Sequence, residues 1–409
     1  MPRSYFALHG VMGWCNLTLA ASAIYLYLGV PLAMREHGWS GTEIGLFQVS
    51  GLPVVLKFLM ASPVDKFRFS QSNYLKWAAL LSIGFVMCLW ALAGAAMRFQ
   101  SLFLIALCMT LVSSWLDVPI NAFVLRRLPE SERGKSGAIR SSVTALASVM
   151  GGGLMLLVYG QWGWQWPFYS FIVMTGVGAL FMFWAYCQYP VQHDEPQQRV
   201  EKRSLCEMWR SYFQRPNQLV WNLILVLHFP FIGAAWLYLK PTLLAFGLTV
   251  SEIAWLSAWA GLVAAFASFC YSQTLKHWSL SRAVSVFSVI NAVALFCMYA
   301  ASAMQWHDWR LIASVMSVAI ALGLSSGVLF AGIMSQCRPE LAASDYGLQS
   351  SLFSLSRIVV PISAGVLLDR LGFSGMYLGL ACCALLVSLV CCFALEDRNK
   401  QISITSRGQ

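Results

Sequence analysis

Residues 100–124 read QSLFLIALCMTLVSSWLDVPINAFV, a run of 25 amino acids with one charged side chain, Asp117. A helix of about 20 apolar residues crosses the roughly 30 Å hydrocarbon core of a bilayer. Similar runs recur along the chain, and they are apolar throughout rather than alternating with the period of two typical of a barrel strand. We therefore predict an all-α membrane protein.

Charges, prolines and turn residues divide the 409-residue chain into twelve candidate transmembrane helices. Hydrophobic residues make up 58% of the composition and charged residues only 11%, an imbalance that excludes an ordinary soluble domain. The predicted spans are residues 6–33, 42–61, 73–97, 100–124, 137–159, 165–190, 217–246, 251–273, 280–303, 308–334, 345–367 and 373–395.

The basic residues are distributed unevenly between the predicted loops. Twenty of the 27 lysines and arginines fall in alternate loops and at the two ends of the chain. Basic residues accumulate on the cytoplasmic side of membrane proteins. We therefore predict cytoplasmic N- and C-termini in a multi-pass protein of a bacterial inner membrane, and we attribute the net charge of +10 to topology rather than to nucleic-acid binding.

One long polar stretch, residues 192–216, separates two halves of similar length. We predict an N-terminal six-helix half (1–191), a cytoplasmic linker (192–216), a C-terminal six-helix half (217–396) and a cytoplasmic tail (397–409). The basic run within the linker favours a topology signal and contact with anionic lipid over a binding site for a soluble partner.

An internal repeat relates the two halves at an offset of 209 residues. Glu43 and Glu252 each follow a hydroxyl residue by three positions, the pattern of a helix capping box. At the same offset Gly163 matches Gly372, and the pair Ser141–Ser142 matches Ser350–Ser351. Such a repeat predicts two parallel six-helix halves with a substrate cavity near mid-membrane.

The stretch Gly45–Arg68, GLFQVSGLPVVLKFLMASPVDKFR, resembles the second span and following loop of one branch of the major facilitator superfamily. This peptide and acetyl-CoA transporter branch includes the AmpG muropeptide permeases and the rhizobactin and pyochelin siderophore permeases. The matching elements are Leu52-Pro53, Lys57-Phe58, Ala61-Ser62-Pro63 and Asp65, with Ser62 as a departure from the branch pattern.

This resemblance implies the twelve-helix major facilitator fold and secondary active transport by alternating access. Muropeptide permeases of this branch are usually longer, so the length of 409 residues favours a proton-coupled importer of a siderophore, free or in its ferric form, or of a similar anionic metabolite. A muropeptide permease and an exporter of drugs or metabolites are the alternatives.

Four charged residues lie well inside the predicted spans, where charge is costly and is usually retained for function: Lys57, Asp117, Lys240 and Arg357. Arg357 lies at the middle of its span, where a guanidinium can hold a carboxylate or phenolate through two hydrogen bonds. The alternative is a structural Arg357 paired with Asp117. Lys57 is a second candidate for the substrate anion or a partner of Asp117, whereas Lys240 lies near a span end and can snorkel to the interface.

Asp117 is the only acid well inside a span, and it is the candidate for proton coupling or, equally, for a gate that closes through a basic partner. The resemblance assigns Asp65 and Arg68 to interdomain gating rather than to substrate binding. His9 and His228 titrate near neutral pH, but each stands alone on an apolar helix, which favours a packing role.

Aromatic and amide side chains complete the predicted substrate site. The pairs Tyr25/Tyr27 and Trp236/Tyr238 lie on spans expected to line the cavity, where their rings would stack on a ligand. Gln349 lies two turns before Arg357 and is the strongest of the amide candidates.

No catalytic constellation, phosphate-binding glycine loop or metal-ligand spacing is found, so we expect no enzyme activity, cofactor or metal. The expected partners are a small-molecule substrate, the proton and the lipid bilayer, with the protein acting as a monomer.

Overall fold

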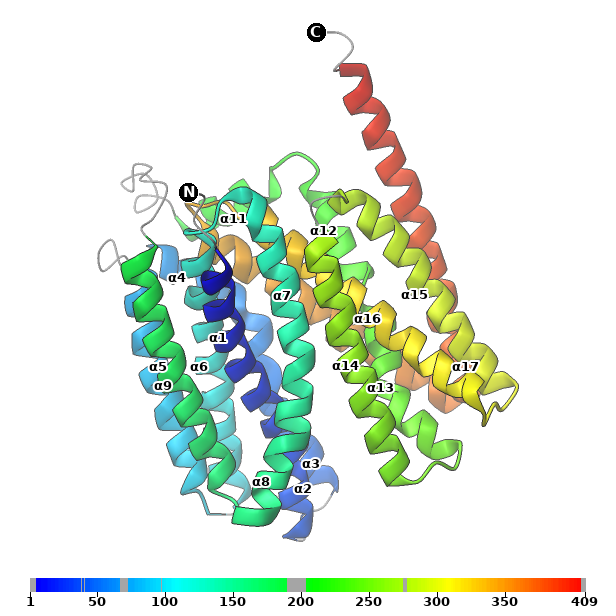
Figure 1. Ribbon diagram of the computed structural model, residues 1–409, viewed down its shortest axis with the longest axis horizontal. Coiled ribbons are helices and arrows are strands. Elements are labelled where there is room, and N and C mark those ends of the chain that lie inside the picture. The colour runs from blue at the N-terminus through cyan, green and yellow to red at the C-terminus, as the bar shows by residue number, and fades with distance from the viewer. Residues whose placement is uncertain are drawn as a thin grey trace. The chain divides into compact units, whose positions relative to one another are not determined.

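A computed structural model describes residues 5–37, 39, 41–66, 73–96, 98–189, 204–274 and 278–405. All regular elements in this part of the chain are helices. The chain forms two compact units: unit 1 comprises Met1–Arg215 and Ile333–Ser351, and unit 2 comprises Pro216–Gly332 and Leu352–Gln409 (Figure 1). The domain boundaries expected from the sequence stay a prediction.

Unit 1 is built on a bundle in which α1 packs on α7 and α9, and α5 packs on α6 and α9. Its elements are α1 (Phe6–Ile24), η1 (Tyr25–Gly29), α2 (Val30–Glu36), α3 (Gly41–Gln48), η2 (Val49–Leu56), α4 (Lys57–Lys66), α5 (Asn73–Ala93), α6 (Phe99–Leu125), α7 (Glu130–Val149), η3 (Met150–Leu154), α8 (Met155–Trp162), α9 (Trp166–Gln188) and α11 (Leu205–Phe213).

Unit 2 is centred on α13, which contacts α12, α14 and α15. Its helices are α12 (Gln218–Leu227), α13 (Pro230–Ala245), α14 (Val250–Thr274), α15 (Leu280–Ala303), α16 (Trp309–Gln336) and α17 (Ala342–Thr405). The last turn of α16 and the first turns of α17 belong to unit 1.

Eleven helical segments of the described chain are long and apolar enough to cross a membrane. The last of them, Ala342–Val390, contains Gly372 at φ 69°, where two helices meet at a kink. Counting these two separately yields the twelve predicted spans. Gly163, which the repeat matches to Gly372, also has a positive φ of 88° at the end of α8. The two glycines that the repeat aligns therefore share a backbone conformation that side chains disfavour.

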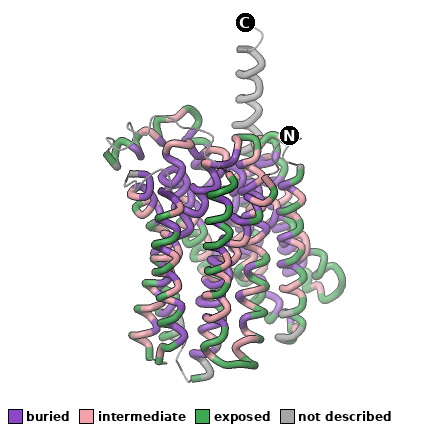
Figure 2. The backbone as a smooth tube through the Cα atoms, turned by 60° about the vertical axis from the view of Figure 1, so that its left-hand side comes forward, coloured by how far each residue is buried: buried purple, intermediate pink, exposed green. Residues whose placement is uncertain are grey.

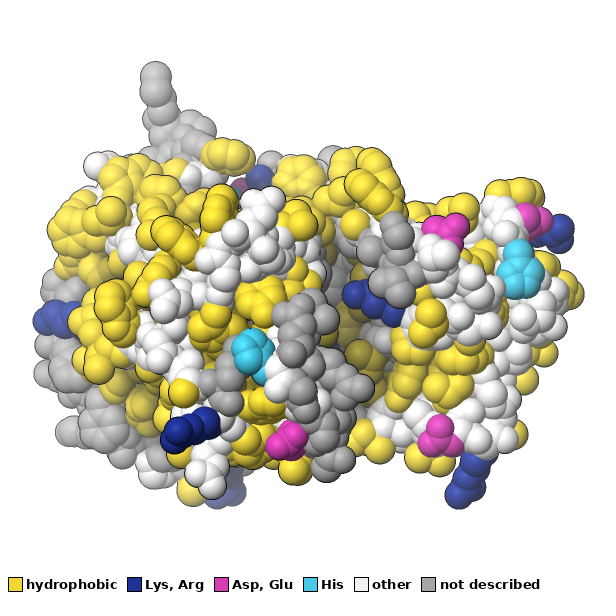
Figure 3. Space-filling view, turned by 90° about the horizontal axis from the view of Figure 1, so that it is seen from below, with side chains coloured by type: hydrophobic (Ala, Val, Ile, Leu, Met, Phe, Trp, Pro, Cys, Tyr) yellow, Lys and Arg dark blue, Asp and Glu magenta, His cyan; other side chains and the backbone are white. Residues whose placement is uncertain are grey.

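Large apolar side chains on the spans remain exposed, as expected for helices that face lipid. Met87 and Trp90 on α5 are each 66% exposed, and Leu180 on α9 is 69% exposed. Buried and exposed positions alternate around the helices, so that each helix has a packed and an outward side (Figure 2). The end of each unit seen in Figure 3, which in unit 1 carries α2, α3 and α8, shows few charged side chains among many apolar ones. The predicted orientation in the membrane is not tested by these observations.

Four spans depart from regular α-helix. η1 and η3 are π-helical turns, and η2 is a 3₁₀ stretch that contains Pro53. The fourth departure lies between α12 and α13, where the chain bends at His228 and Phe229 before Pro230. Proline lacks the N–H that would continue the helix and clashes with the preceding turn, which explains this break. The sequence predicted one continuous span over residues 217–246.

Polar residues 204–216 of the predicted linker contain a helix. Ser204 and Glu207 form a capping box at the start of α11, with hydrogen bonds of 3.1 Å and 2.8 Å. The buried face of α11 carries Met208, which packs with Leu341, and Trp209 donates to Ser62 Oγ at 3.0 Å. The capping box predicted at Thr249 and Glu252 is confirmed, whereas its counterpart at Ser40 lies outside the described residues.

Candidate substrate and coupling sites

Asp117 lies at the centre of a buried ionic cluster in unit 1. Lys57 Nζ donates to Asp117 Oδ2 at 2.7 Å, and Arg140 Nη2 donates to Oδ1 at 2.9 Å and to Oδ2 at 3.1 Å. The hydroxyl of Tyr346, from the first turns of α17, donates to Oδ2 at 2.6 Å. The carboxylate is only 6% exposed, so it is held by two cations and a phenol with almost no access to water.

Two asparagines extend this cluster. Asn121, one turn after Asp117 on α6, donates to Oδ1 at 2.9 Å, and Arg140 Nε donates to Asn16 Oδ1 at 2.7 Å. The guanidinium of Arg140 also lies 5.3 Å from the centre of the Tyr346 ring. One acid and two bases leave a formal charge of +1. Because these groups are buried, removing any one of them would leave its partners as uncompensated charges in the interior.

The helix α7 supplies Arg140, which lies in the first turn of the predicted span 137–159 and was therefore counted with the cytoplasmic charges rather than with the charges well inside spans. The polar stretch after Pro129 suggested a loop, but α7 begins at Glu130 and buries Arg133, Gly137 and Arg140 on one face. Their spacing of four and three residues was the signal for an amphipathic helix. Tyr346 had no comparable signal, because it reaches Asp117 from a position 229 residues later in the chain.

Two further carboxylates anchor the segment between α16 and α17 in unit 1. Asp65 accepts hydrogen bonds from the Tyr74 hydroxyl at 2.6 Å and from the backbone N–H of Ser344 at 2.7 Å. Asp345 binds the guanidinium of Arg338 through contacts of 2.7 Å and 2.9 Å. Although burial alone would lower it, the hydrogen bonds to Asp345 raise the pKa of Arg338 above its usual value. Arg68, the predicted partner of Asp65 in gating, lies outside the described residues.

Three other predicted residues of unit 1 lie apart from Asp117. Gln349 is fully buried, and its amide donates to the backbone carbonyl of Asp345 at 3.2 Å. Tyr25 is 1% exposed and packs edge-on against Phe168. The hydroxyl of Tyr27 bonds to Ser50 and Thr110. The structure therefore brings Lys57 and Asp117 together, but not these three side chains.

Unit 2 presents a different arrangement around Arg357. This residue is exposed near the middle of the first part of α17, and its guanidinium lies 5.7 Å from the ring centre of Phe229 and 5.5 Å from that of Phe353. No carboxylate of the described residues forms an ion pair with it. Arginine over aromatic faces keeps its hydrogen-bonding edge available for an anion.

Two predicted aromatic residues share α13. The Tyr238 hydroxyl donates to the carbonyl of Pro361, one turn after Arg357, at 3.0 Å, so Tyr238 orients the same stretch of α17. Trp236 is partly exposed. Lys240 is exposed toward the end of the span, as expected for a lysine that snorkels.

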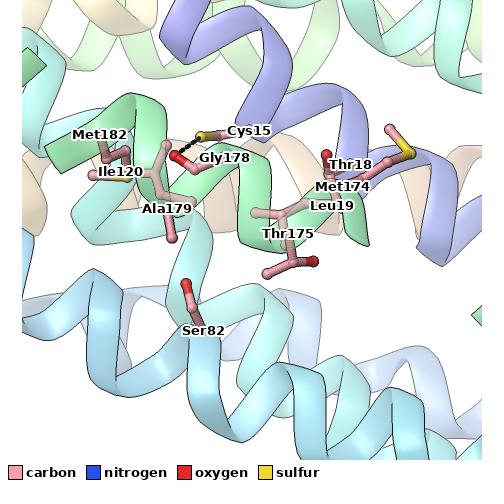
Figure 4. Close-up of a pocket in the computed structure, with 10 residues that line it drawn as sticks. All are labelled: Cys15, Thr18, Leu19, Ser82, Ile120, Met174, Thr175, Gly178, Ala179 and Met182. Atoms are coloured by element: carbon pink, nitrogen blue, oxygen red, sulfur yellow. Dashed lines mark hydrogen bonds between the residues drawn. The ribbon is translucent and has the colours of Figure 1, made fainter. Parts of the chain in front are cut away.

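A small cavity in unit 1 involves none of the predicted residues. Ten residues of α1, α5, α6 and α9 line it, with Cys15, Thr18, Ser82 and Thr175 as its polar members (Figure 4). The Cys15 thiol contacts the carbonyl of Gly178 at 3.8 Å. This lining can accommodate a small apolar group, but it has no charged anchor for an anion.

A sequence model described as Major Facilitator Superfamily matches residues 12–361, most of the chain. The chain belongs to the major facilitator superfamily. Anhydromuropeptide permease of Escherichia coli K12 is 25% identical over a 421-position alignment that covers 94% of this chain and 82% of the permease. Putative transporter AmpG 1 of Rickettsia bellii is 20% identical, with 91% of this chain and 92% of the relative covered.

Solved major facilitator structures share the fold. The human organic anion transporter MFSD10 superposes with a TM-score of 0.74 at 14% identity, covering 95% of this chain and 100% of that one. The proton:xylose symporter XylE superposes with a TM-score of 0.72 at 12% identity and covers 94% of each chain. These similarities confirm the predicted all-α fold of twelve transmembrane helices in two parallel six-helix halves.

As a major facilitator protein, the chain is a multi-pass membrane transporter and not an enzyme. The predicted resemblance to the AmpG branch is confirmed by the two relatives. Siderophore import, proton coupling and the roles of individual residues stay predictions.

Proposed function

We propose that this transporter imports an anionic muropeptide across the bacterial inner membrane, driven by the proton gradient. The similarity to an anhydromuropeptide permease extends over nearly the whole chain, which supports this substrate class over the siderophore favoured by chain length. Muropeptides and siderophores both carry anionic groups beside bulky ring or chain structures. Siderophore import therefore stays a separate prediction, which the same uptake assay tests.

The proposal that the substrate is an anion rests on the surroundings of Arg357. A guanidinium within a span costs several kcal/mol unless it has a function or a partner. Arg357 is exposed on α17, rests on two aromatic rings and has no ion pair among the described residues. A substrate carboxylate would supply the missing anion, and Phe229 and Phe353 would hold the guanidinium in place.

Lys57 and Asp117 have a different role in this proposal. Because Lys57 forms an ion pair with Asp117 at 2.7 Å, we assign it to the buried ionic cluster rather than to the substrate site. The hydrogen bond that Asp65 accepts from the backbone N–H of Ser344, in the first turn of α17, supports the predicted gating role of Asp65, since movement of α17 away from α4 would break it.

The test is uptake of radiolabelled anhydromuropeptide, and of ferric siderophores as a panel, in cells with and without the gene. We expect gene-dependent muropeptide accumulation that a proton uncoupler abolishes. Uptake of a siderophore alone would replace the muropeptide, and gene-independent uptake of every compound would refute the import proposal.

Variants of Arg357 test the anion site in the same assay. Arg357→Ala should reduce uptake at least about tenfold with normal abundance in the membrane, and Arg357→Lys should restore part of it, because a lysine keeps the charge but not the two-bond geometry. Arg370→Ala is the matched control, since Arg370 is also an exposed arginine of α17. Equal loss in the control, or loss of abundance in both Arg357 variants, would contradict substrate binding by Arg357.

A further inference from the structure

The break between α12 and α13 places a histidine in the interior of unit 2. His228 is 2% exposed and lies where the span bends before Pro230. Its backbone carbonyl, which the break removes from the helical ladder, accepts a hydrogen bond from Asn291 Nδ2 at 3.1 Å. Asn291 Oδ1 in turn accepts from the Ser325 hydroxyl at 2.7 Å. The break is thus stabilised by polar groups from α15 and α16.

The hydrogen bonds around His228 determine its tautomer. Ser288 Oγ donates its single proton to the carbonyl of Val284 at 2.8 Å, and it lies 2.9 Å from His228 Nδ1. When Ser288 gives its proton to Val284, its oxygen can only accept from the imidazole, and we therefore assign the ring hydrogen to Nδ1. In the neutral ring Nε2 is then a bare lone pair, and it is buried without a hydrogen-bond partner among the residues that the structure describes.

The charged groups of the surrounding helices leave Arg357 as the relevant neighbour. The helices α14, α15 and α16 each carry their described charge in the first turn, at Glu252, Arg282 and Arg310 respectively, and α13 carries Lys240 toward its far end. Ser288, Asn291 and Ser325, which face the break, do not titrate. Arg357 lies 5.7 Å from the ring centre of Phe229, the residue next to His228, so it is linked to the break through this side chain.

We propose that His228 is the proton-binding group that couples transport to the proton gradient, with Nε2 accepting the proton when a substrate anion binds at Arg357. This inference rests on the proposed import function. The lone pair of Nε2 takes up the proton, the ring becomes an imidazolium with an N–H at each nitrogen, and the incoming anion balances the new charge. Because the two binding equilibria are linked, a bound anion raises the affinity for the proton by the same factor as a bound proton raises the affinity for the anion.

Asp117, the coupling candidate from the sequence, is less suited to this role. Protonation of its carboxylate would leave Lys57 and Arg140 together in a buried site without their anion. His228 meets no such obstacle, because its protonation separates no ion pair.

The experiment compares two transport modes of reconstituted protein with labelled anhydromuropeptide. Accumulation against a gradient requires coupling, whereas exchange of external for internal substrate does not. His228→Gln should lower proton-driven accumulation at least about tenfold, while exchange continues and loses its dependence on pH. His9→Gln is the matched control, since His9 is likewise a buried histidine of a predicted span and its ring already contacts Glu132 at 3.1 Å.

Full accumulation by His228→Gln would overturn the proposal, and so would parallel loss of exchange and accumulation, which would indicate a structural role. Absence of both modes in the wild type would instead count against the import function. For that case, nitrogen NMR of histidine-labelled protein tests the site without substrate. The signal that disappears in His228→Gln should report a neutral ring with the hydrogen on Nδ1, and the opposite tautomer would overturn the proposal.

Discussion

The two units each contain a buried polar centre, but these centres differ in whether their bonding capacity is used. Asp117 in unit 1 binds two cations, a phenol and an amide, so that its carboxylate has no capacity left for a ligand. In unit 2, among the residues that the structure describes, His228 Nε2 has no hydrogen-bond partner and Arg357 has no ion pair. A saturated centre stabilises one arrangement of helices, whereas a centre with unused capacity can respond to a proton or a substrate.

The largest effect that would distinguish the two centres is expected from Asp117→Asn. This change keeps the shape of the side chain but leaves Lys57 and Arg140 buried without an anion, which should cost about 3–5 kcal/mol of stability. Thermal unfolding in detergent and membrane abundance are the measurements. Asp308→Asn, at an exposed ion pair with Arg310, should change neither measurement. An Asp117→Asn protein with wild-type stability and full substrate accumulation would contradict the structural role of the Asp117 cluster.

A smaller loss is expected from Tyr346→Phe, which removes one hydrogen bond to the Asp117 carboxylate. Bonds to charged groups contribute about 1.5–3 kcal/mol, so the unfolding midpoint should fall measurably. Tyr377→Phe is the matched control, since Tyr377 is equally buried but bonds to the neutral Thr242 hydroxyl at 2.8 Å. Equal losses in the two variants would show that the charge of Asp117 adds nothing to the Tyr346 bond.

The smallest stability effect is expected from Ser288→Ala, at about 1 kcal/mol, because it removes a neutral acceptor from His228 Nδ1. Its effect on function should be clearer: without Ser288 the tautomer is no longer determined, and the pH profile of accumulation should shift. Ser314→Ala, which removes a buried hydroxyl that bonds within α16, should leave the profile unchanged. A profile insensitive to Ser288 would weaken the link between this network and the proton.

The fold could be predicted from the sequence because hydrophobic length alone determines which segments cross the membrane. The pairing of Lys57 with Asp117 was also among the predicted alternatives, because they are two of the few charged residues inside the predicted spans and have opposite sign. Arg140 was missed as a site residue because it lies in the first turn of the predicted span 137–159 and was counted with the cytoplasmic charges, although its spacing from Arg133 and Gly137 indicated a buried helical face.

Other features depended on tertiary contacts that no local pattern contains. Tyr346 reaches Asp117 from the far end of the sequence, and the tautomer of His228 depends on a serine 60 residues later. Pro230 was a visible signal for the break in the seventh span, but only the packing of Asn291 and Ser325 against it explains why the break is stable.

Substrate-induced proton movement into proteoliposomes is the most direct test of proton-coupled import through His228, because one assay measures the effects of the substrate, the proton and the His228 variant together. A pH-sensitive dye in the lumen should report acidification when anhydromuropeptide is added outside wild-type vesicles. The same addition should produce no acidification with His228→Gln, and wild-type behaviour with His9→Gln. Substrate entry into wild-type vesicles without proton movement would contradict proton-coupled import.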